Sequence, residues 1–157
     1  MSTPLKYTRT QIALHWSVFV LLFVSFVSHD GIKDAYRSFM RNGAAEMSVG
    51  AYVHIIVGIV ILALVVWRIA LRFTNTAPPE PKGGLLGLAA KAVQFILYAV
   101  LVILPVSGLI AWFGGLHDAG DVHETMFTLG LALVALHIIA ALVHQFYWKD
   151  NLLARMK

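Results

Sequence analysis

The segment VHETMFTLGLALVALHIIAALVHQFYW, residues 122–148, decides the fold. It is apolar along most of its length, and as an α-helix it is longer than the ~30 Å hydrocarbon core of a bilayer. Four of its residues recur at intervals of seven and so form one stripe along such a helix: His123, Gly130, His137 and His144. Polar groups at membrane depth are costly and tend to face a bundle interior. The segment therefore predicts a membrane helix whose histidines face other helices.

Three further apolar runs of similar length precede this segment. A bilayer-spanning helix needs about 20 mostly apolar residues. The connecting segments are short, and short connections join antiparallel neighbours. One of them, TNTAPPEPKGG, contains Pro and Gly, which do not continue a helix. We predict one all-α domain over residues 1–157, an up-down-up-down four-helix membrane bundle with helices at about 12–28, 49–73, 85–113 and 122–148, joined by loops at 29–48, 74–84 and 114–121.

The composition agrees with a membrane protein. Apolar residues make up 59% of the chain and charged residues 13%, whereas soluble domains carry roughly 25% charged residues. The absence of cysteine excludes disulfides, thiolate metal sites, cysteine-held iron–sulfur clusters and covalently attached c-type haem. The formal charge is +4, but the basic residues flank the apolar runs. We therefore expect the lipid bilayer, and not nucleic acid, as a partner.

The basic residues also predict the orientation. Nine of the twelve Lys and Arg lie near the two termini and the 74–84 loop, and three lie in the 29–48 loop. Because cytoplasmic loops carry an excess of Lys and Arg, we expect both termini in the cytoplasm. The opposite side holds six of the eight acidic residues, so its local net charge is −3. That charge does not favour the approach of an anion such as superoxide.

The membrane histidines fall at two depths. His123 and His137 are 14 residues apart, which places them on one helix face about 21 Å apart along the axis. His54 lies near the outer start of its helix, level with His123. His15 lies about two turns from the inner start of the first helix, level with His137. The sequence therefore predicts one histidine pair in each half of the membrane.

Two facing imidazoles at each level favour haem b over zinc. Zinc takes four protein ligands, or three and a water, and neither level offers a third. Haem b needs two axial imidazoles, and its large apolar ring suits a bundle interior. An iron held by two imidazoles has no open position, so such a centre transfers electrons rather than binding O2. We predict two non-covalent, bis-histidine b haems, with His15, His54, His123 and His137 as iron ligands.

Three further residues are expected beside the cofactors. Gly58 lies one turn from His54 on its face, and Gly130 leaves room between the two haem levels. The alternative for both glycines is close packing of helices. Arg68 lies 14 residues after His54, so it shares that face at the level of the inner haem, where a haem propionate is a natural partner. The alternative is that Arg68 extends to the inner interface.

Several motifs together resemble the bacterial cytochrome b561 family, within the wider group of four-helix di-haem membrane cytochromes b. The resemblance covers nearly the whole chain, and its last motif is the most specific. The motifs are KYTRTQIALHW, AYVHIIVG, VVWRIALR, ILPVSGL, VHETMFTLG and ALHIIAALVHQFYWKDNLLARM.

The resemblance implies a multi-pass protein of the bacterial inner membrane. It also implies that His15 and His137 bind a cytoplasmic haem, and that His54 and His123 bind a periplasmic one. Members of the family pass electrons across or along the membrane, often with a quinone as one partner. Some are similar to proteins that oxidise superoxide and reduce ubiquinone.

His144 continues the stripe but has no predicted haem to bind. A quinone site needs a hydrogen-bond donor and a proton source, and histidine supplies both. We therefore predict quinone binding by His144, Trp148 and Lys149. The alternative is an interfacial histidine that bonds water or a lipid headgroup.

These observations predict a transmembrane electron carrier that exchanges electrons with the quinone pool. Ubiquinone is the expected substrate, and the outer donor is open, with superoxide as one candidate. Whether the protein is an enzyme, a superoxide:ubiquinone oxidoreductase, depends on that donor. Two alternatives are a membrane-anchor cytochrome b subunit of a larger hydrogenase or dehydrogenase complex, and a haem-free four-helix scaffold.

Overall fold

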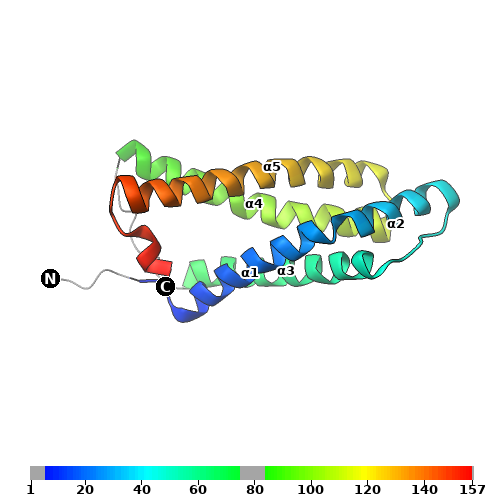
Figure 1. Cartoon of the computed structure of the whole chain (residues 1–157), viewed down its shortest axis with the longest axis horizontal. Helices are drawn as coiled ribbons and strands as arrows, with labels where there is room; N and C mark the ends of the chain where they lie inside the picture. Colours follow the sequence, from blue (N-terminus) through cyan, green and yellow to red (C-terminus); the bar gives the residue numbers. More distant parts are fainter. Residues whose placement is uncertain (1–5, 75–83, 157) are drawn as a thin grey trace.

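Four long helices alternate in direction along the chain in the computed structural model, which describes residues 6–74 and 84–156 (Figure 1). Each contains a segment long and apolar enough to cross a membrane. The described residues form no β-strand, so the predicted all-α, four-helix membrane bundle is confirmed. The four helices are α1 (Arg9–Val27), α3 (Val49–Thr74), α4 (Gly84–Gly114) and α5 (His117–Leu142).

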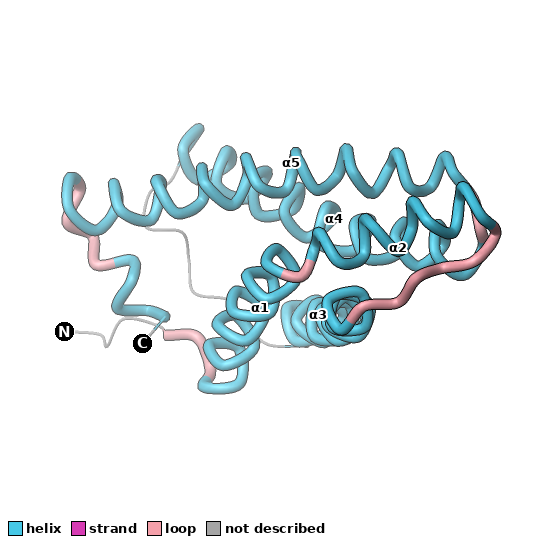
Figure 2. The backbone as a smooth tube through the Cα atoms, turned by 45° about the vertical axis from the view of Figure 1, so that its right-hand side comes forward, coloured by secondary structure: helices cyan, strands magenta, loops and turns pink. Residues whose placement is uncertain are grey.

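The bundle is built of two helix pairs. α1 lies along α3 and α4 lies along α5, while α3 and α4 also pack together (Figures 1 and 2). The described ends of the chain lie at the same end of the bundle, where the indole nitrogen of Trp16 donates a hydrogen bond to the carbonyl of Met156 (3.1 Å). That these ends face the cytoplasm remains a prediction from the distribution of Lys and Arg.

The segment between the first two membrane helices differs from the predicted 29–48 loop. It forms a helix, α2 (His29–Asn42), which packs on α3. Its inner face carries buried Ala35 and Ser38 and half-buried Ile32, Tyr36 and Phe39, which recur at helical spacing, so the segment is an amphipathic helix. The loop prediction rested on the polar, mixed-charge composition of residues 29–48 and missed this periodicity. Gly43 ends the helix in the left-handed conformation (φ 71°), as glycine commonly does.

Local signals move two other helix ends. α1 begins before the predicted residue 12, because Thr8 and Gln11 form a capping box in which each side chain bonds the other's backbone N–H. The predicted 114–121 loop shrinks to Gly115 and Leu116, since α5 already begins at His117. Asp118 in the first turn of α5 suits the positive end of the helix dipole.

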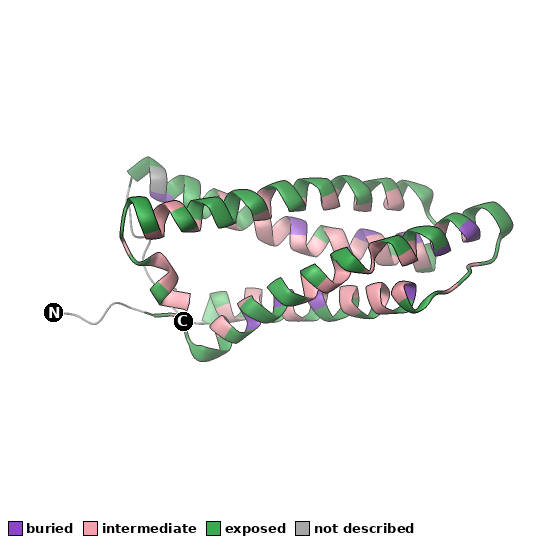
Figure 3. Ribbon diagram, viewed as in Figure 1, coloured by how far each residue is buried: buried purple, intermediate pink, exposed green. Residues whose placement is uncertain are grey.

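Few residues of the four long helices are buried (Figure 3). Val18, Ile61 and Val65 form a small buried cluster between α1 and α3, and no residue of α5 is buried. Large apolar side chains such as Phe95, 75% exposed, lie where lipid surrounds a membrane protein. The sides of α1 and α5 that face each other are in contact through aromatic side chains. For example, Phe26 is stacked on Phe127 with ring centroids 6.2 Å apart.

Gly31→Ala tests the packing of α2 on α3. An added Cβ would lie 2.9 Å from the backbone nitrogen of Ala51 and 2.9 Å from the carbonyl carbon of Gly50. Because a helix backbone cannot give way like a flexible side chain, we expect overpacking to cost about 1–3 kcal/mol. The apparent melting temperature in detergent should fall.

Gly114→Ala is the matched control, since its Cβ would meet only ordinary contacts at 3.8 and 3.9 Å. Equal melting temperatures for the two variants would show that α2 does not pack on α3 as described.

Candidate functional site: two histidine pairs inside the bundle

The structure brings His54 of α3 and His123 of α5 together in the half of the bundle away from the described chain ends, which is called the outer half after its predicted side. Their ring centroids lie 6.3 Å apart, with an angle of 73° between the ring planes. The Nδ1 atom of His54 donates to the carbonyl of Ser25 (3.0 Å), and that of His123 donates to the carbonyl of Leu104 (2.7 Å). Because a carbonyl only accepts, Nδ1 carries the proton in each ring. Nε2 is then left as the free base, the form that binds a metal.

A largely apolar pocket lies beside this outer pair. Side chains from all four long helices line it, including Phe26, Ile61, Leu101 and Phe127. Gly58 also lines the pocket, and an added Cβ there would meet nothing within 4 Å. Gly58 therefore borders open space rather than a neighbouring helix, which favours the cofactor-side interpretation of this glycine.

Gly130 behaves differently. An added Cβ would lie 3.3 Å from Cγ1 of Val100 on α4. This close approach favours the helix-packing alternative for Gly130, since a larger residue would push α4 and α5 apart.

His15 of α1 and His137 of α5 form the inner pair, with ring centroids 6.2 Å apart. The Nη1 atom of Arg68 lies 3.1 Å from Nδ1 of His15, and its guanidinium lies over the ring of Tyr98, 5.8 Å from the centroid. Arg68 thus points toward the inner pair and not away to the interface. A guanidinium only donates, so Nδ1 of His15 accepts in this arrangement.

The spacing of both pairs fits a metal bound between two imidazoles. Metal–imidazole bonds are about 2 Å long, so two nitrogens on opposite sides of one ion lie about 4 Å apart and the ring centres about 6 Å apart. The described residues bring one group of three potential metal ligands together, the exposed His117, Asp118 and Asp121 at the start of α5. Neither histidine pair belongs to that group. A four-ligand zinc site therefore does not fit either pair, whereas the two axial ligands of a haem do.

His29 is a site residue that the sequence analysis missed by placing it in a loop. It is the first residue of α2 and lines the outer pocket. Its ring is stacked on Phe127 (centroids 5.4 Å, 5° between planes) and meets the ring of His54 at 6.0 Å. Its position immediately after the first apolar run was the available signal, since a residue there lies at the outer interface.

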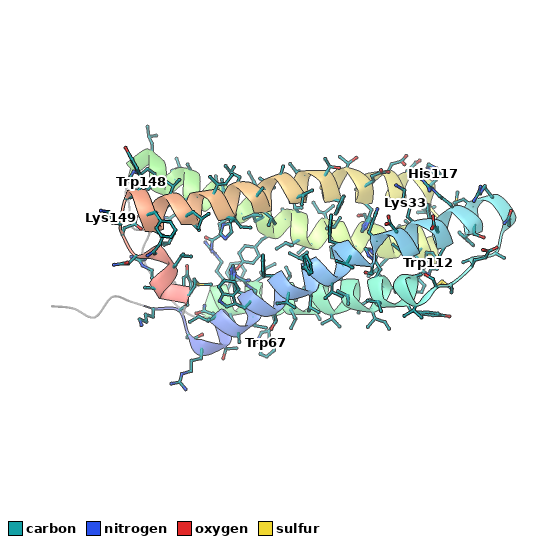
Figure 4. All side chains as sticks on the ribbon, viewed as in Figure 1. Lys33, Trp67, Trp112, His117, Trp148 and Lys149 are labelled. Atoms are coloured by element: carbon teal, nitrogen blue, oxygen red, sulfur yellow. The ribbon has the colours of Figure 1, made fainter. Side chains whose placement is uncertain are left out.

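The inner end of the bundle holds the predicted quinone residues. His144 lies in a π-helical turn, η1 (Val143–Tyr147), and its Nδ1 atom is 2.6 Å from Oδ2 of Asp150. The ring of Trp148 stands edge-on to His144 with centroids 4.6 Å apart. Trp148 and Lys149 lie at the opposite end of the molecule from Lys33 and His117 (Figure 4). The chain then ends in a short 3₁₀ turn, η2 (Leu152–Met156).

This arrangement of helices and histidines agrees with comparison to known proteins. Residues 6–157 match the family described as prokaryotic cytochrome b561. The chain belongs to that family. It is therefore a bacterial multi-pass membrane protein of the cytochrome b561 family that binds haem b and transfers electrons.

Three relatives match 96% of this chain each. Cytochrome b562 of Cereibacter sphaeroides is 34% identical over 151 residues, with 94% of its own length covered. A protein named "probable superoxide oxidase CybB" of Yersinia pestis is 28% identical with 95% of its length covered. Cytochrome b561 homolog 1 of Escherichia coli is 25% identical with 96% covered.

The two pairs generate a test by ligand removal. We expect two b haems per chain, because each of the two histidine pairs would supply one set of iron ligands. His15→Ala and His137→Ala should remove one and the same haem, and His54→Ala and His123→Ala the other. Haem per chain is measured by the pyridine-haemochrome assay, and the lost centre is identified by its redox titration.

Gln94→Ala is a suitable control, because it changes a half-buried polar residue of α4 outside both pairs. If His15→Ala and His54→Ala removed the same haem, the assignment of the two levels would be wrong.

Proposed function

We propose that this cytochrome b561 carries two bis-histidine b haems and passes electrons between the two sides of the membrane, exchanging them with the quinone pool. The observation that carries the proposal is the presence of two facing histidine pairs at nearly equal spacing, 6.2 and 6.3 Å, in opposite halves of the bundle. His15 and His137 would hold the inner haem, and His54 and His123 the outer one. The family membership argues against the haem-free scaffold.

The protein's own groups would orient and insulate these centres. Haem supplies one-electron chemistry when both axial positions are filled by imidazole. The Nδ1 hydrogen bonds of His54 and His123 fix the rings, because rotation would break a bond to a backbone carbonyl. The apolar walls around the outer pair exclude water. The helices thus provide rigid positions and leave the redox change to the cofactors.

Arg68 is proposed to neutralise a haem propionate on the inner side. If Nε2 of His15 binds iron, the proton of the neutral ring lies on Nδ1, which then no longer accepts from Arg68. The guanidinium needs another acceptor, and a carboxylate offers the strongest, bidentate pairing. The 3.1 Å contact between Nη1 of Arg68 and Nδ1 of His15 supports a role for Arg68 at the inner centre.

The quinone site is proposed at the inner end, at His144. Reduction of a quinone to a quinol takes up two electrons and two protons. The carboxylate of Asp150 accepts from Nδ1 of His144 at 2.6 Å, so it holds the orientation of the ring. A proton taken up from the cytoplasm on Nε2 can then pass to a quinone oxygen. Trp148, edge-on to the same ring, and Lys149 would border the headgroup.

Superoxide is a second candidate, as the electron donor at the outer side. One relative is named a probable superoxide oxidase. In addition, α2 carries three exposed cations spaced by four residues, Lys33, Arg37 and Arg41. They form a cationic stripe despite the acidic surroundings.

Two of the relatives contain segments that this chain lacks. The alignments with the probable superoxide oxidase and with cytochrome b561 homolog 1 run over 178 and 176 positions, more than the 157 residues of this chain. The alignment with cytochrome b562 runs over 151 positions.

Arg68→Met tests the inner haem environment. Oxidised iron carries one more positive charge than reduced iron, so a nearby cation favours the reduced form. Loss of Arg68 should lower the midpoint potential of the inner haem and leave that of the outer haem nearly unchanged. Redox titration followed in the visible haem bands measures both. Arg72→Met is the matched control, because Arg72 contacts the same Tyr98 ring but makes no described contact with His15. Equal shifts in both haems would contradict the assignment.

His144→Phe tests the quinone site. Both haems and their spectra should persist, and reduction by an outer donor should continue, but reoxidation by quinone should slow. Loss of one hydrogen bond accounts for up to about tenfold in quinone affinity, and loss of the proton donor can slow turnover by a further ~10²-fold. Stopped-flow reoxidation with a soluble ubiquinone measures the effect.

His117→Phe serves as the control, since it changes an exposed histidine at the opposite end of α5. Reoxidation of His144→Phe at the wild-type rate would remove the quinone role and leave His144 as an interfacial residue. Loss of a haem would instead make it a ligand.

A further inference from the structure

Helix α4 carries no predicted haem ligand, yet it lies directly against one. At Gly108 the backbone of α4 meets the ring of His123: an added Cβ would lie 2.8 Å from Nδ1, 2.8 Å from Cε1 and 3.6 Å from Cγ. Contacts of 2.8 Å between a Cβ and a ring atom are sterically forbidden, so one of the two groups would have to move. The observed position of the His123 ring therefore requires glycine at residue 108.

This close approach allows a hydrogen bond between the two helices. The His123 ring lies close enough to the α4 backbone for its Nδ1–H to donate to the carbonyl oxygen of Leu104 at 2.7 Å. Leu104 lies one helical turn before Gly108. The same oxygen also accepts the hydroxyl of Ser107 at 2.9 Å. An alanine at 108 would lift the ring off α4, because a side chain gives way more easily than a helix backbone. Lifting the ring would stretch or break the bond to Leu104.

This contact between a histidine ring and the α4 backbone is found at the outer level. Among the described residues, His137 on the same helix as His123 has no hydrogen bond from its ring to a backbone carbonyl. At the inner level, Arg68 instead lies beside His15, the partner of His137. A ring N–H bonded to an acceptor makes the opposite ring nitrogen a stronger donor to a metal. Stronger donation favours oxidised over reduced iron, which lowers the midpoint potential.

We propose that Gly108 is a positioning residue for the outer haem: by leaving room for the His123 ring on α4, it holds the Nδ1–H bond to Leu104 and so keeps the potential of that haem low. The inference rests on the proposed role of His123 as an iron ligand. It assigns to α4 an electronic influence on one of the two centres, although the helix contributes no ligand to either.

Gly108→Ala in the full-length, haem-loaded protein tests this inference. We expect the midpoint potential of the outer haem to rise, and the low-spin ferric EPR signal of that haem to shift with the altered ring position, or the outer haem alone to be lost. The inner haem should keep its content, potential and signal. Gly114→Ala is the matched control in the same helix, since its Cβ would meet nothing closer than 3.8 Å.

His123→Ala, measured in parallel, separates this inference from the proposed function. If His123→Ala keeps both haems, the ligand assignment itself fails. If it loses the outer haem while Gly108→Ala retains wild-type potentials and EPR signals, the ligand assignment stands and the role of Gly108 is overturned. A lowered outer potential in Gly108→Ala, equal shifts in both haems, or loss of both haems would also overturn it, because none of these follows from displacement of the His123 ring alone.

Discussion

The pairing of imidazoles across the bundle is the constraint on which the rest of the structure depends. The four histidines of the two pairs lie within segments long enough to span a membrane, where an unpartnered polar ring is costly. Each ring finds its counterpart on another helix at 6.2 or 6.3 Å. Both pairs use α5, which supplies His123 and His137 from one face. The bundle therefore has to keep α5 opposite α1 and α3, with room between them for a flat apolar ring.

The two levels are built differently, and the difference bears on electron transfer. At the outer level, backbone carbonyls of α1 and α4 hold the Nδ1 atoms of His54 and His123. At the inner level, a cation, Arg68, lies beside His15. Hydrogen bonds of the first kind strengthen the donor nitrogens and favour oxidised iron, whereas a cation favours reduced iron. If the two pairs hold haem as proposed, both effects favour the higher potential at the inner centre.

The two ends of the bundle are closed by segments of opposite character. At one end, α2 packs on α3 and carries a cationic stripe on its exposed side. At the other end, the chain turns back after α5, so that Asp150 reaches His144 and Met156 reaches Trp16. The first closure leaves charged groups at the end of the bundle nearest the His54–His123 pair. The second brings Asp150 and Trp148 against His144, which lies ~10 Å along the helix axis beyond His137 because seven residues separate the two histidines.

The sequence by itself determined the four membrane helices and the depth of each histidine, because a helix rises a fixed 1.5 Å per residue and a bilayer has a fixed thickness. The helix α2 was also signalled, because Ile32, Tyr36 and Phe39 recur at helical spacing, but the polar, mixed-charge composition of residues 29–48 led to the prediction of a loop. Only the tertiary structure decided which nitrogen of His123 is free, why residue 108 is glycine, and that Asp150 pairs with His144. These features depend on how each helix is rotated about its own axis and on contacts between distant segments. Hydrophobic periodicity fixes the length and depth of a membrane helix, but when apolar residues surround it on all sides, it does not fix that rotation.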